Sequence, residues 1–216
     1  MNSNISILIP ARGGSKRIKN KNVVIIDGKP LIAYCLEQAL KITKNVFVST
    51  DCDKIKKACK PYDVTVIDRP IHLAGDKSDV RDTIKHFLSK NDCEILILMQ
   101  ATSPLVQSEH VLEGIDKMKK YDSVISVYET KSFFWDVNNQ PINYDPLNKP
   151  RTQDMNPVFV ENGAFYITKK ENFIKNNILT NGNVGFVTMP ENLSIDIDNE
   201  KDLKMFKFML KYTKNE

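Results

Sequence analysis

Residues 5–22 read ISILIPARGGSKRIKNKN, a short apolar run that leads directly into a basic loop. The apolar residues 5–9 predict a buried strand. After the loop, apolar side chains recur at helical spacing from Ile32 to Leu40, and Pro30 suits the first turn of that helix. A buried strand, a loop and an amphipathic helix in this order are the repeating unit of an α/β sheet.

The same alternation of apolar runs and amphipathic stretches continues along the chain. Further strands are expected at residues 46–48, 64–67, 94–99, 123–128, 164–167 and 185–189. Helices follow several of them: one capped by Asp51 or Asp53, one capped by Ser78 or Asp79, and two more at residues 108–120 and 200–212. Residues 94–99 form the most apolar run and are placed at the sheet centre. The pattern predicts an open, mostly parallel sheet with helices on both faces.

This rhythm is interrupted between residues 130 and 158. The stretch is rich in Pro, Asn and Asp and contains the chain's one tryptophan, Trp135. It is too long for a simple connection. We expect residues 1–216 to form one domain that carries an irregular insertion at about 130–158, which either lies near the site or forms a lobe that packs on a partner.

Composition narrows the class of protein. The chain has 216 residues, 41% hydrophobic and 27% charged, with a net charge of +4, which is a globular profile. Four cysteines and three histidines show no zinc spacing. No stretch approaches the ~18 apolar residues of a membrane span, and no signal peptide is evident. We therefore expect a cytoplasmic protein with reduced thiols and no membrane partner.

The basic loop is the sharpest candidate site. Residues 12–22 hold five cations and no acid, at the carboxyl end of the first strand, where open α/β sheets bind ligands. The paired Gly13 and Gly14 let backbone N–H groups approach an anion, so a polyphosphate is the expected ligand. The alternatives are a solvated basic loop or a nucleic-acid patch. Neither a P-loop nor a dinucleotide fingerprint is present.

A second candidate is the run SIDID at residues 194–198. On an extended strand Asp196 and Asp198 would share one face while Ile195 and Ile197 point into the core. Two aligned carboxylates beside a triphosphate suit Mg²⁺. The alternative is that the aspartates merely cap the following helix, which is a stronger possibility for Asp198 than for Asp196.

Two further stretches are weaker signals when taken alone. QATSPL at residues 100–105 follows the most apolar strand, where polar side chains read a base or ribose, although a helix-capping turn fits as well. PRTQD at 150–154 and ENGAFY at 161–166 contain Arg151 and Glu161. These could hold a carboxylate ligand or form a surface ion pair.

Together, these five stretches in this order resemble the acylneuraminate cytidylyltransferase family, the CMP-sialic acid synthetases, over nearly the whole chain. The resemblance implies a Rossmann-like three-layer α/β sandwich of the nucleotide-diphospho-sugar transferase type. It also implies a homodimer in which the irregular segment reaches toward the partner's site. The activity implied is transfer of CMP from CTP to an N-acylneuraminate-type nine-carbon 2-keto acid, with release of pyrophosphate. No nucleic-acid partner and no appended catalytic domain are expected.

The resemblance also implies roles for matching residues. Catalytic roles fall to the basic side chains and the two aspartates: Arg12, Lys16, Lys21, Asp196 and Asp198. Nucleotide contacts fall to Ala11, Arg12, Gly13, Lys21, Asn22, Ser78 and Gln100. Sugar contacts fall to Gln100, Arg151, Glu161, Asn162 and Tyr166. Mg²⁺ is the implied cofactor, held by Asp196 and Asp198.

The chain departs from the family pattern at three positions. Ala101 stands where many relatives have Pro, Val106 where they have Arg, and Thr152 where they have a second Arg. The last two changes remove cations that could meet phosphate or carboxylate, which leaves the acylated sugar open. An eight-carbon keto-deoxy acid, legionaminic acid and pseudaminic acid are alternative acceptors. A nucleotide-sugar-dependent glycosyltransferase and a non-catalytic nucleic-acid-binding protein are alternatives of other classes.

Overall fold

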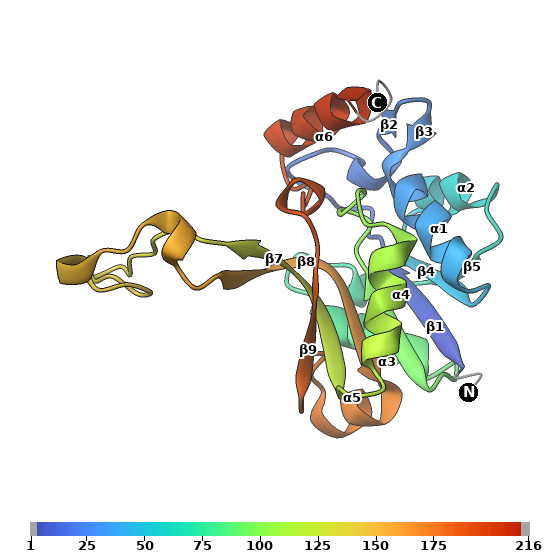
Figure 1. The fold of residues 1–216 in the computed structure, drawn as a ribbon. Coiled ribbons are helices and arrows are strands. Elements are labelled where there is room, and N and C mark those ends of the chain that lie inside the picture. Colours follow the sequence, from blue (N-terminus) through green and yellow to red (C-terminus); the bar gives the residue numbers. More distant parts are fainter. Residues whose placement is uncertain (1–3, 213–216) are drawn as a thin grey trace.

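A computed structural model describes residues 4–212 (Figure 1). The strands are β1 (Ile5–Pro10), β2 (Ile25–Ile26), β3 (Lys29–Pro30), β4 (Val46–Thr50), β5 (Thr65–Asp68), β6 (Ile95–Met99), β7 (Ser123–Thr130), β8 (Val158–Lys169) and β9 (Val184–Thr188). The α-helices are α1 (Leu31–Ile42), α2 (Asp53–Cys59), α3 (Val80–Leu88), α4 (Ser108–Lys117), α5 (Lys170–Asn176) and α6 (Glu200–Tyr212). The strands expected from apolar runs and the helices expected from spacing are therefore present.

Within residues 4–212, seven strands form one sheet in the order β5-β4-β1-β6-β8-β7-β9. The most apolar strand, β6, is the central one, as predicted. Four of the neighbouring pairs are parallel, whereas β8 runs antiparallel to both β6 and β7. The prediction of a mostly parallel sheet is confirmed, and β8 is the strand that departs from it.

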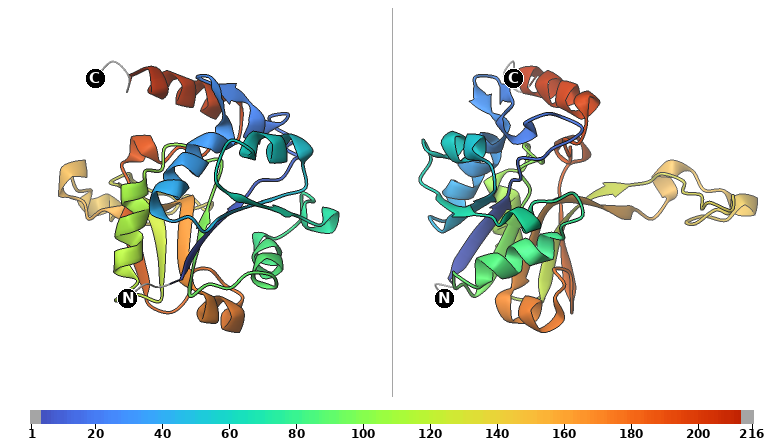
Figure 2. Two further views of the ribbon diagram at one scale, coloured as in Figure 1. Left: turned by 90° about the vertical axis from the view of Figure 1, so that its right-hand side faces the viewer. Right: turned by 180° about the vertical axis from the view of Figure 1, so that it is seen from behind.

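The sheet is covered on both faces, which gives the three layers that were expected. Alternate residues of β1 point to opposite sides: Ile7 and Ile9 pack with α1, α2 and α4, whereas Leu8 packs with α3 and α5. Figure 2 shows α1 and α4 on one side of the sheet and α3 on the other. A third cluster around Phe206 joins α6 to the basic loop through Ile18 and to the aspartate run through Ile197. This cluster holds the two candidate motifs together.

Gly114 lets α4 pack closely on the sheet. A Cβ at this position would lie 2.6 Å from Ile167 Cδ1 and 3.3 Å from Phe165 Cε2. Gly114→Ala in a helix would ordinarily stabilise by about 1 kcal/mol. Here the buried neighbours leave no space, so we expect a net loss of about 1–2 kcal/mol in the free energy of unfolding. Urea unfolding followed by circular dichroism measures it, and an unchanged or raised stability would contradict the packing argument.

The insertion forms an arm that projects from the body of the molecule (Figure 1). Its base is the paired ends of β7 and β8, with Thr130 opposite Val158. Beyond them, the rings of Phe133 and Trp135 pack edge-on against Tyr144, at centroid distances of 4.7 and 5.8 Å. The arm thus has its own small aromatic cluster.

Two local predictions are wrong. Neither Asp51 nor Asp53 caps α2, whose N-cap is Cys52 without a side-chain bond, because the carboxylate of Asp51 accepts from the N–H of Gly13 instead. Residues 194–198 are not a strand of the sheet. They lie beside the turn that follows β6, where the N–H of Ile197 donates to the carbonyl of Thr102 over 2.8 Å. Asp79, in contrast, caps α3 as expected.

The four cysteines are free thiols. Burial raises the pKa of Cys35 to about 12 and the pKa values of Cys59 and Cys93 to about 11. Only Cys52 is partly exposed. Because the thiolate is the reactive form, we expect iodoacetamide at pH 8 to modify Cys52 alone in the native protein. Mass spectrometry of tryptic peptides checks this, and rapid labelling of Cys35 would contradict it.

Within the described part of the chain, none of the helices combines the length and the apolar character that crossing a membrane requires.

Candidate active site

A cleft of about 600 Å³ opens at the carboxyl ends of the parallel strands. It is bounded by the basic loop after β1, the segment between β5 and α3, and the residues after β6. Its charged lining residues are Arg12, Lys16, Arg17, Lys21, Arg69, Asp76 and Asp198. Among the described residues, five cations and two carboxylates therefore line it, a formal balance of 5 − 2 = +3. Such a cleft suits an anion with several negative charges.

The basic loop is fixed by backbone contacts. A Cβ at Gly13 would lie 2.7 Å from Cys52 Cβ, so the chain passes too close to α2 for another residue. The N–H of Gly13 donates to Asp51 over 2.9 Å. It is therefore engaged with protein in this structure, unlike the anion-facing N–H that the glycine pair led us to expect. The cations of the loop, not its glycines, line the cleft.

The four cations of the basic loop that line the cleft form ion pairs with two carboxylates, two cations with each. Asp76 contacts Arg12 at 2.7 Å and also Lys16, while Asp198 contacts Arg17 at 2.9 Å and Lys21 at 3.2 Å. Hydrogen bonds from Lys16 and Arg12 hold the pKa of Asp76 below its ordinary value, so this carboxylate is ionised at neutral pH. Each of the two acids thus partly neutralises two cations of the cleft.

The aspartate run lies against the basic loop. Lys21, whose side chain is only 12% exposed, donates to the carbonyl of Ile197 over 2.6 Å as well as to Asp198. Ile197 is fully buried, as predicted, and Asn199 caps α6 by accepting from the N–H of Lys201. The alternative in which Asp198 is the helix cap is therefore not what the structure shows, and its carboxylate faces the cleft.

Asp196 lies beside Asp198 but is not among the residues that line the cleft. Part of its surface is exposed to solvent. The rest is covered by protein, and this loss of hydration raises the pKa of the carboxyl above its ordinary value. A hydrogen bond with Thr102 opposes that rise, and the negative charge of Asp198 adds to it. Thr102 thus contacts the aspartate run through both its side chain and its carbonyl.

Arg69 is a site residue that the sequence pattern did not reveal. It follows β5, is 8% exposed and lines the cleft. Its Nε donates to Ser49 Oγ over 3.1 Å and its Nη2 to the Ser49 carbonyl over 2.6 Å. Burial lowers the pKa of Arg69 to about 10, so the guanidinium is still charged at neutral pH. Its position shortly after an expected strand, like that of Arg12, was the one feature of the sequence that could have marked it as a site residue.

The expected nucleotide contacts gather around the same cleft. Asn22, Ser78 and Gln100 line it. Asn22 is 6% exposed, its Nδ2 donates to the carbonyl of Arg12, and its buried Oδ1 has no partner among the described residues. Ser78 donates to the carbonyl of His72. Ala11 is buried and does not line the cleft, and its N–H donates to the carbonyl of Ser49 over 2.9 Å.

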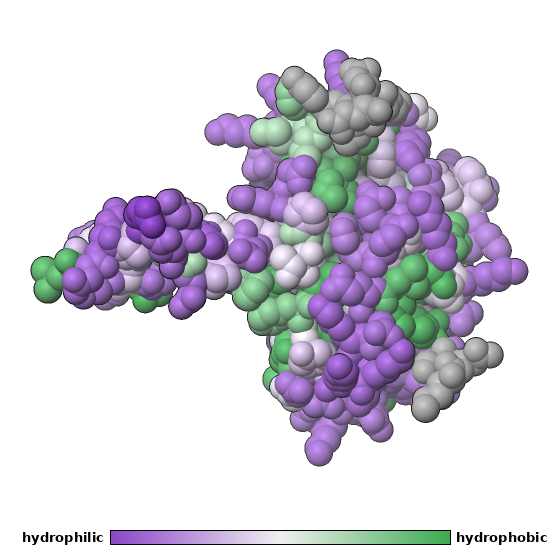
Figure 3. All heavy atoms as spheres, viewed as in Figure 1, coloured by the Kyte–Doolittle hydropathy of each residue, from purple (hydrophilic) through white to green (hydrophobic). Residues whose placement is uncertain are grey.

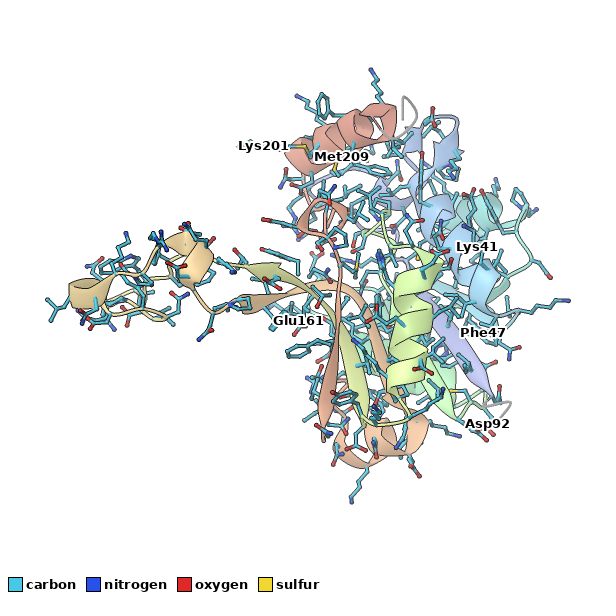
Figure 4. The ribbon with its side chains drawn as sticks, viewed as in Figure 1. Lys41, Phe47, Asp92, Glu161, Lys201 and Met209 are labelled. Carbon is cyan, nitrogen blue, oxygen red and sulfur yellow. The ribbon has the colours of Figure 1, made fainter. Side chains whose placement is uncertain are left out.

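The expected sugar contacts divide into two groups. Tyr166 donates to Glu161, and burial, followed by this hydrogen bond, raises the pKa of the phenol. Asn162 donates to Ser194 Oγ over 2.9 Å and so ties β8 to the aspartate run. Figure 4 shows Glu161 near the point where β8 leaves the body for the arm.

Arg151 lies in the arm, 75% exposed at its side chain, and pairs with Asp154 at 2.7 Å. It does not line the cleft of its own chain. The structure therefore brings Glu161, Asn162 and Tyr166 toward the aspartate run and leaves Arg151 apart from them.

Known proteins that resemble the chain are cytidylyltransferases. Residues 6–215 match the family model described as cytidylyltransferase. The chain is 35% identical over 210 residues to N-acylneuraminate cytidylyltransferase A of Danio rerio, covering 92% of this chain and 49% of the relative. It is 29% identical to pseudaminic acid cytidylyltransferase of Campylobacter jejuni, covering 94% and 95% respectively.

A solved structure of CMP:2-keto-3-deoxy-manno-octonic acid synthetase complexed with CTP superimposes with a TM-score of 0.71 at 18% identity. The match covers 98% of this chain and all of the other, and it supports the fold. The chain spans about half the length of the curated N-acylneuraminate relatives that it matches.

Proposed function

Because the chain belongs to the cytidylyltransferase family, we propose that it joins CMP from CTP to an N-acylneuraminate-type nine-carbon 2-keto acid and releases pyrophosphate. The N-acylneuraminate names of the relatives and the order of the five motifs support this choice of acceptor. The pseudaminic acid relative makes that sugar a second candidate, because the chain covers nearly all of its length.

The observation that carries the proposal is the charge of the cleft. Five cations converge at the carboxyl ends of parallel strands, against two carboxylates, and the aspartate run borders the same space. A nucleoside triphosphate carries several negative charges along one chain of phosphates, which matches a row of cations better than a single carboxylate ligand does. We place the triphosphate along Arg12, Lys16 and Lys21.

The nucleoside would lie deeper in the cleft. Arg69 provides a buried cation there, Asn22 provides a buried oxygen without a partner, and Ser78 and Gln100 provide polar side chains at the rim. Polar groups of this kind fix a base and a ribose by hydrogen bonds. Ala11 and Gly13 would act through the backbone, by shaping the loop that carries Arg12.

We propose Mg²⁺ as the cofactor, held by Asp196 and Asp198. Carboxylate oxygens are the ligands this ion prefers, and it commonly completes its shell with substrate phosphates and water. The donor set fits that pattern: Asp198 lines the cleft, and Asp196 lies close enough for the negative charge of Asp198 to raise the pKa of its carboxyl. When bound, the ion would supply electrophilic polarisation of the α-phosphate and favour ionisation of the attacking hydroxyl.

In the proposed reaction, the anomeric hydroxyl on C2 of the sugar acid attacks the α-phosphorus of CTP in line. One P–O bond forms to the sugar, the bond to the β-phosphate breaks, and pyrophosphate leaves with its electron pair. Arg12, Lys16 and Lys21 offset the charge that develops on the leaving group. Asp196 is the candidate acceptor of the hydroxyl proton. Positioning and electrostatics would provide most of the rate enhancement.

The sugar would lie between the aspartate run and β8, near Glu161, Asn162 and Tyr166.

We also propose a homodimer in which the arm supplies Arg151 to the partner's site, since Arg151 does not reach the cleft of its own chain. Exposed apolar side chains on the arm support a contact with another protein surface: Trp135, Val137, Ile142 and Leu147. Figure 3 shows apolar surface at the far end of the arm.

The test is an assay of pyrophosphate release with purified protein, Mg²⁺ and each of four nucleoside triphosphates. The acceptors are N-acetylneuraminic, legionaminic, pseudaminic and an eight-carbon keto-deoxy acid. We expect turnover with CTP and a nine-carbon acid. Selective use of the eight-carbon acid would correct the acceptor. In a parallel reaction supplied with a nucleotide sugar and no triphosphate, release of a nucleoside diphosphate would instead indicate a glycosyltransferase and overturn the proposal.

A further inference from the structure

Asp76 contacts the same two cations that the proposed reaction assigns to the triphosphate. Its Oδ1 lies 2.7 Å from Arg12 Nη1, and its Oδ2 contacts Lys16 Nζ. It approaches from the segment between β5 and α3, which faces the basic loop across the cleft. A carboxylate and a phosphate group use the same kind of charged hydrogen bond to such donors. The two cannot occupy the same donors fully at the same time.

The surroundings allow the Asp76 carboxylate to leave without unfolding its loop. The segment is anchored on both sides of Asp76: the Ser78 hydroxyl donates to the carbonyl of His72, and Asp79 caps α3. Asp76 itself is 40% exposed at its side chain, so rotation about its own bonds would return the carboxylate to water. Exposed ion pairs of this kind contribute little to folding, so releasing them costs little.

We propose that Asp76 weakens anion binding at the phosphate site: its carboxylate competes with phosphate groups for Arg12 and Lys16. The inference rests on the proposed function, because it requires phosphate groups to bind to these cations. A five-cation cleft without such a competitor would also retain small anions, including the pyrophosphate product. A nucleoside triphosphate has further contacts in the cleft and can displace the carboxylate, whereas pyrophosphate has only the phosphate contacts.

The competition predicts a tighter complex with pyrophosphate when the charge of Asp76 is removed. Asp76→Asn keeps the size of the side chain but removes the negative charge. We expect the dissociation constant for pyrophosphate, measured by calorimetry without nucleotide or metal, to fall about threefold to tenfold. The dissociation constant for CTP should fall by a similar factor, because its phosphate groups would displace the same carboxylate. Asp76→Ser, which also removes the carboxylate, should behave in the same way.

Asp79→Asn is the matched control. It removes the same charge three residues away, from an aspartate that pairs with Arg81 and does not line the cleft. Asparagine caps a helix about as well as aspartate, so α3 should be unaffected. Pyrophosphate binding by this variant should stay within twofold of the wild type. Thermal unfolding of all three variants confirms that they are folded.

Unchanged or weaker pyrophosphate binding by Asp76→Asn would overturn the inference and show that Asp76 merely orients Arg12 and Lys16. Absence of pyrophosphate binding by both wild type and Asp76→Asn would overturn it as well. A wild-type protein that binds pyrophosphate but neither binds nor turns over CTP would instead count against the proposed function. The comparison of wild type and variant would then still decide whether Asp76 competes with anions.

Discussion

Replacing Asp198 by Asn is expected to lower turnover with CTP and Mg²⁺ by at least about 100-fold. Asp198 faces the cleft, where it contacts Arg17 and Lys21, and an amide would be a weak ligand for Mg²⁺. The fold should persist, because the side chain is 39% exposed and α6 is capped by Asn199 instead. Initial rates over a range of Mg²⁺ concentrations measure the effect.

Asp92→Asn is the control for Asp198→Asn. Asp92 also pairs with a lysine, Lys170, but at the other end of the sheet. Figure 4 shows Asp92 at the opposite end of the molecule from Lys201, which follows Asp198 closely in the chain. This variant should keep full activity. Activity of Asp198→Asn within threefold of the wild type would contradict the assignment of Asp198 to the metal.

Replacing Arg69 by Met is expected to raise the KM for CTP by about 10-fold to 100-fold, with a smaller effect on kcat. The estimate follows from the loss of about 1.5–3 kcal/mol when a charged hydrogen-bond donor is removed. Arg69 is a buried cation in the cleft that forms no ion pair with any described residue. Its carbonyl partner on Ser49 retains the N–H of Ala11 as a donor, so folding should survive. Initial rates over a range of CTP concentrations measure the effect.

Arg81→Met provides the matched control for Arg69→Met. Arg81 lies on the exposed side of α3, pairs with Asp79 and does not line the cleft. Its replacement should leave the KM for CTP unchanged. If Arg69→Met remains folded and has a KM within twofold of the wild type, Arg69 has a structural role in holding β4 and does not contact the nucleotide.

The sheet was predictable because its strands are apolar runs of the right length. Residues 94–99 are almost entirely apolar, and only a strand covered on both faces needs such a run, so β6 falls at the centre. The direction of β8 was not predictable in the same way. Strand direction depends on which strands pair, and the long arm before β8 removes the local constraint of a helical crossover.

The site was predictable in part. The basic loop and the aspartate run stand out as local patterns, and the third core cluster brings them together through Ile18, Ile197 and Phe206. Arg69 and Asp76 were missed because each is a single charged residue in a segment without a recognisable pattern. Their importance depends on contacts across the cleft, with Ser49 in one case and with Arg12 and Lys16 in the other.

Residues 194–198 were expected to form a strand, which they do not, yet the burial of Ile197 was predicted correctly. Alternation along a strand predicted that Ile197 is buried while Asp198 faces the ligand. Ile197 is buried and Asp198 lines the cleft, as alternation would place them, but Asp196 does not line the cleft. The segment is held by the carbonyl of Thr102 and by Lys21 instead of a neighbouring strand. The proposed role of Arg151 depends on a second chain, so neither the local sequence nor the fold of one chain could predict it.

The central claim is that the chain transfers CMP. The most direct measurement is ³¹P nuclear magnetic resonance of one reaction containing protein, Mg²⁺, CTP and the mixture of four sugar acids. We predict that the three CTP resonances give way to one phosphodiester resonance of a CMP-sugar and to pyrophosphate, in equal amounts. Unchanged CTP in the presence of folded protein, or its conversion to CDP and phosphate, would contradict that claim.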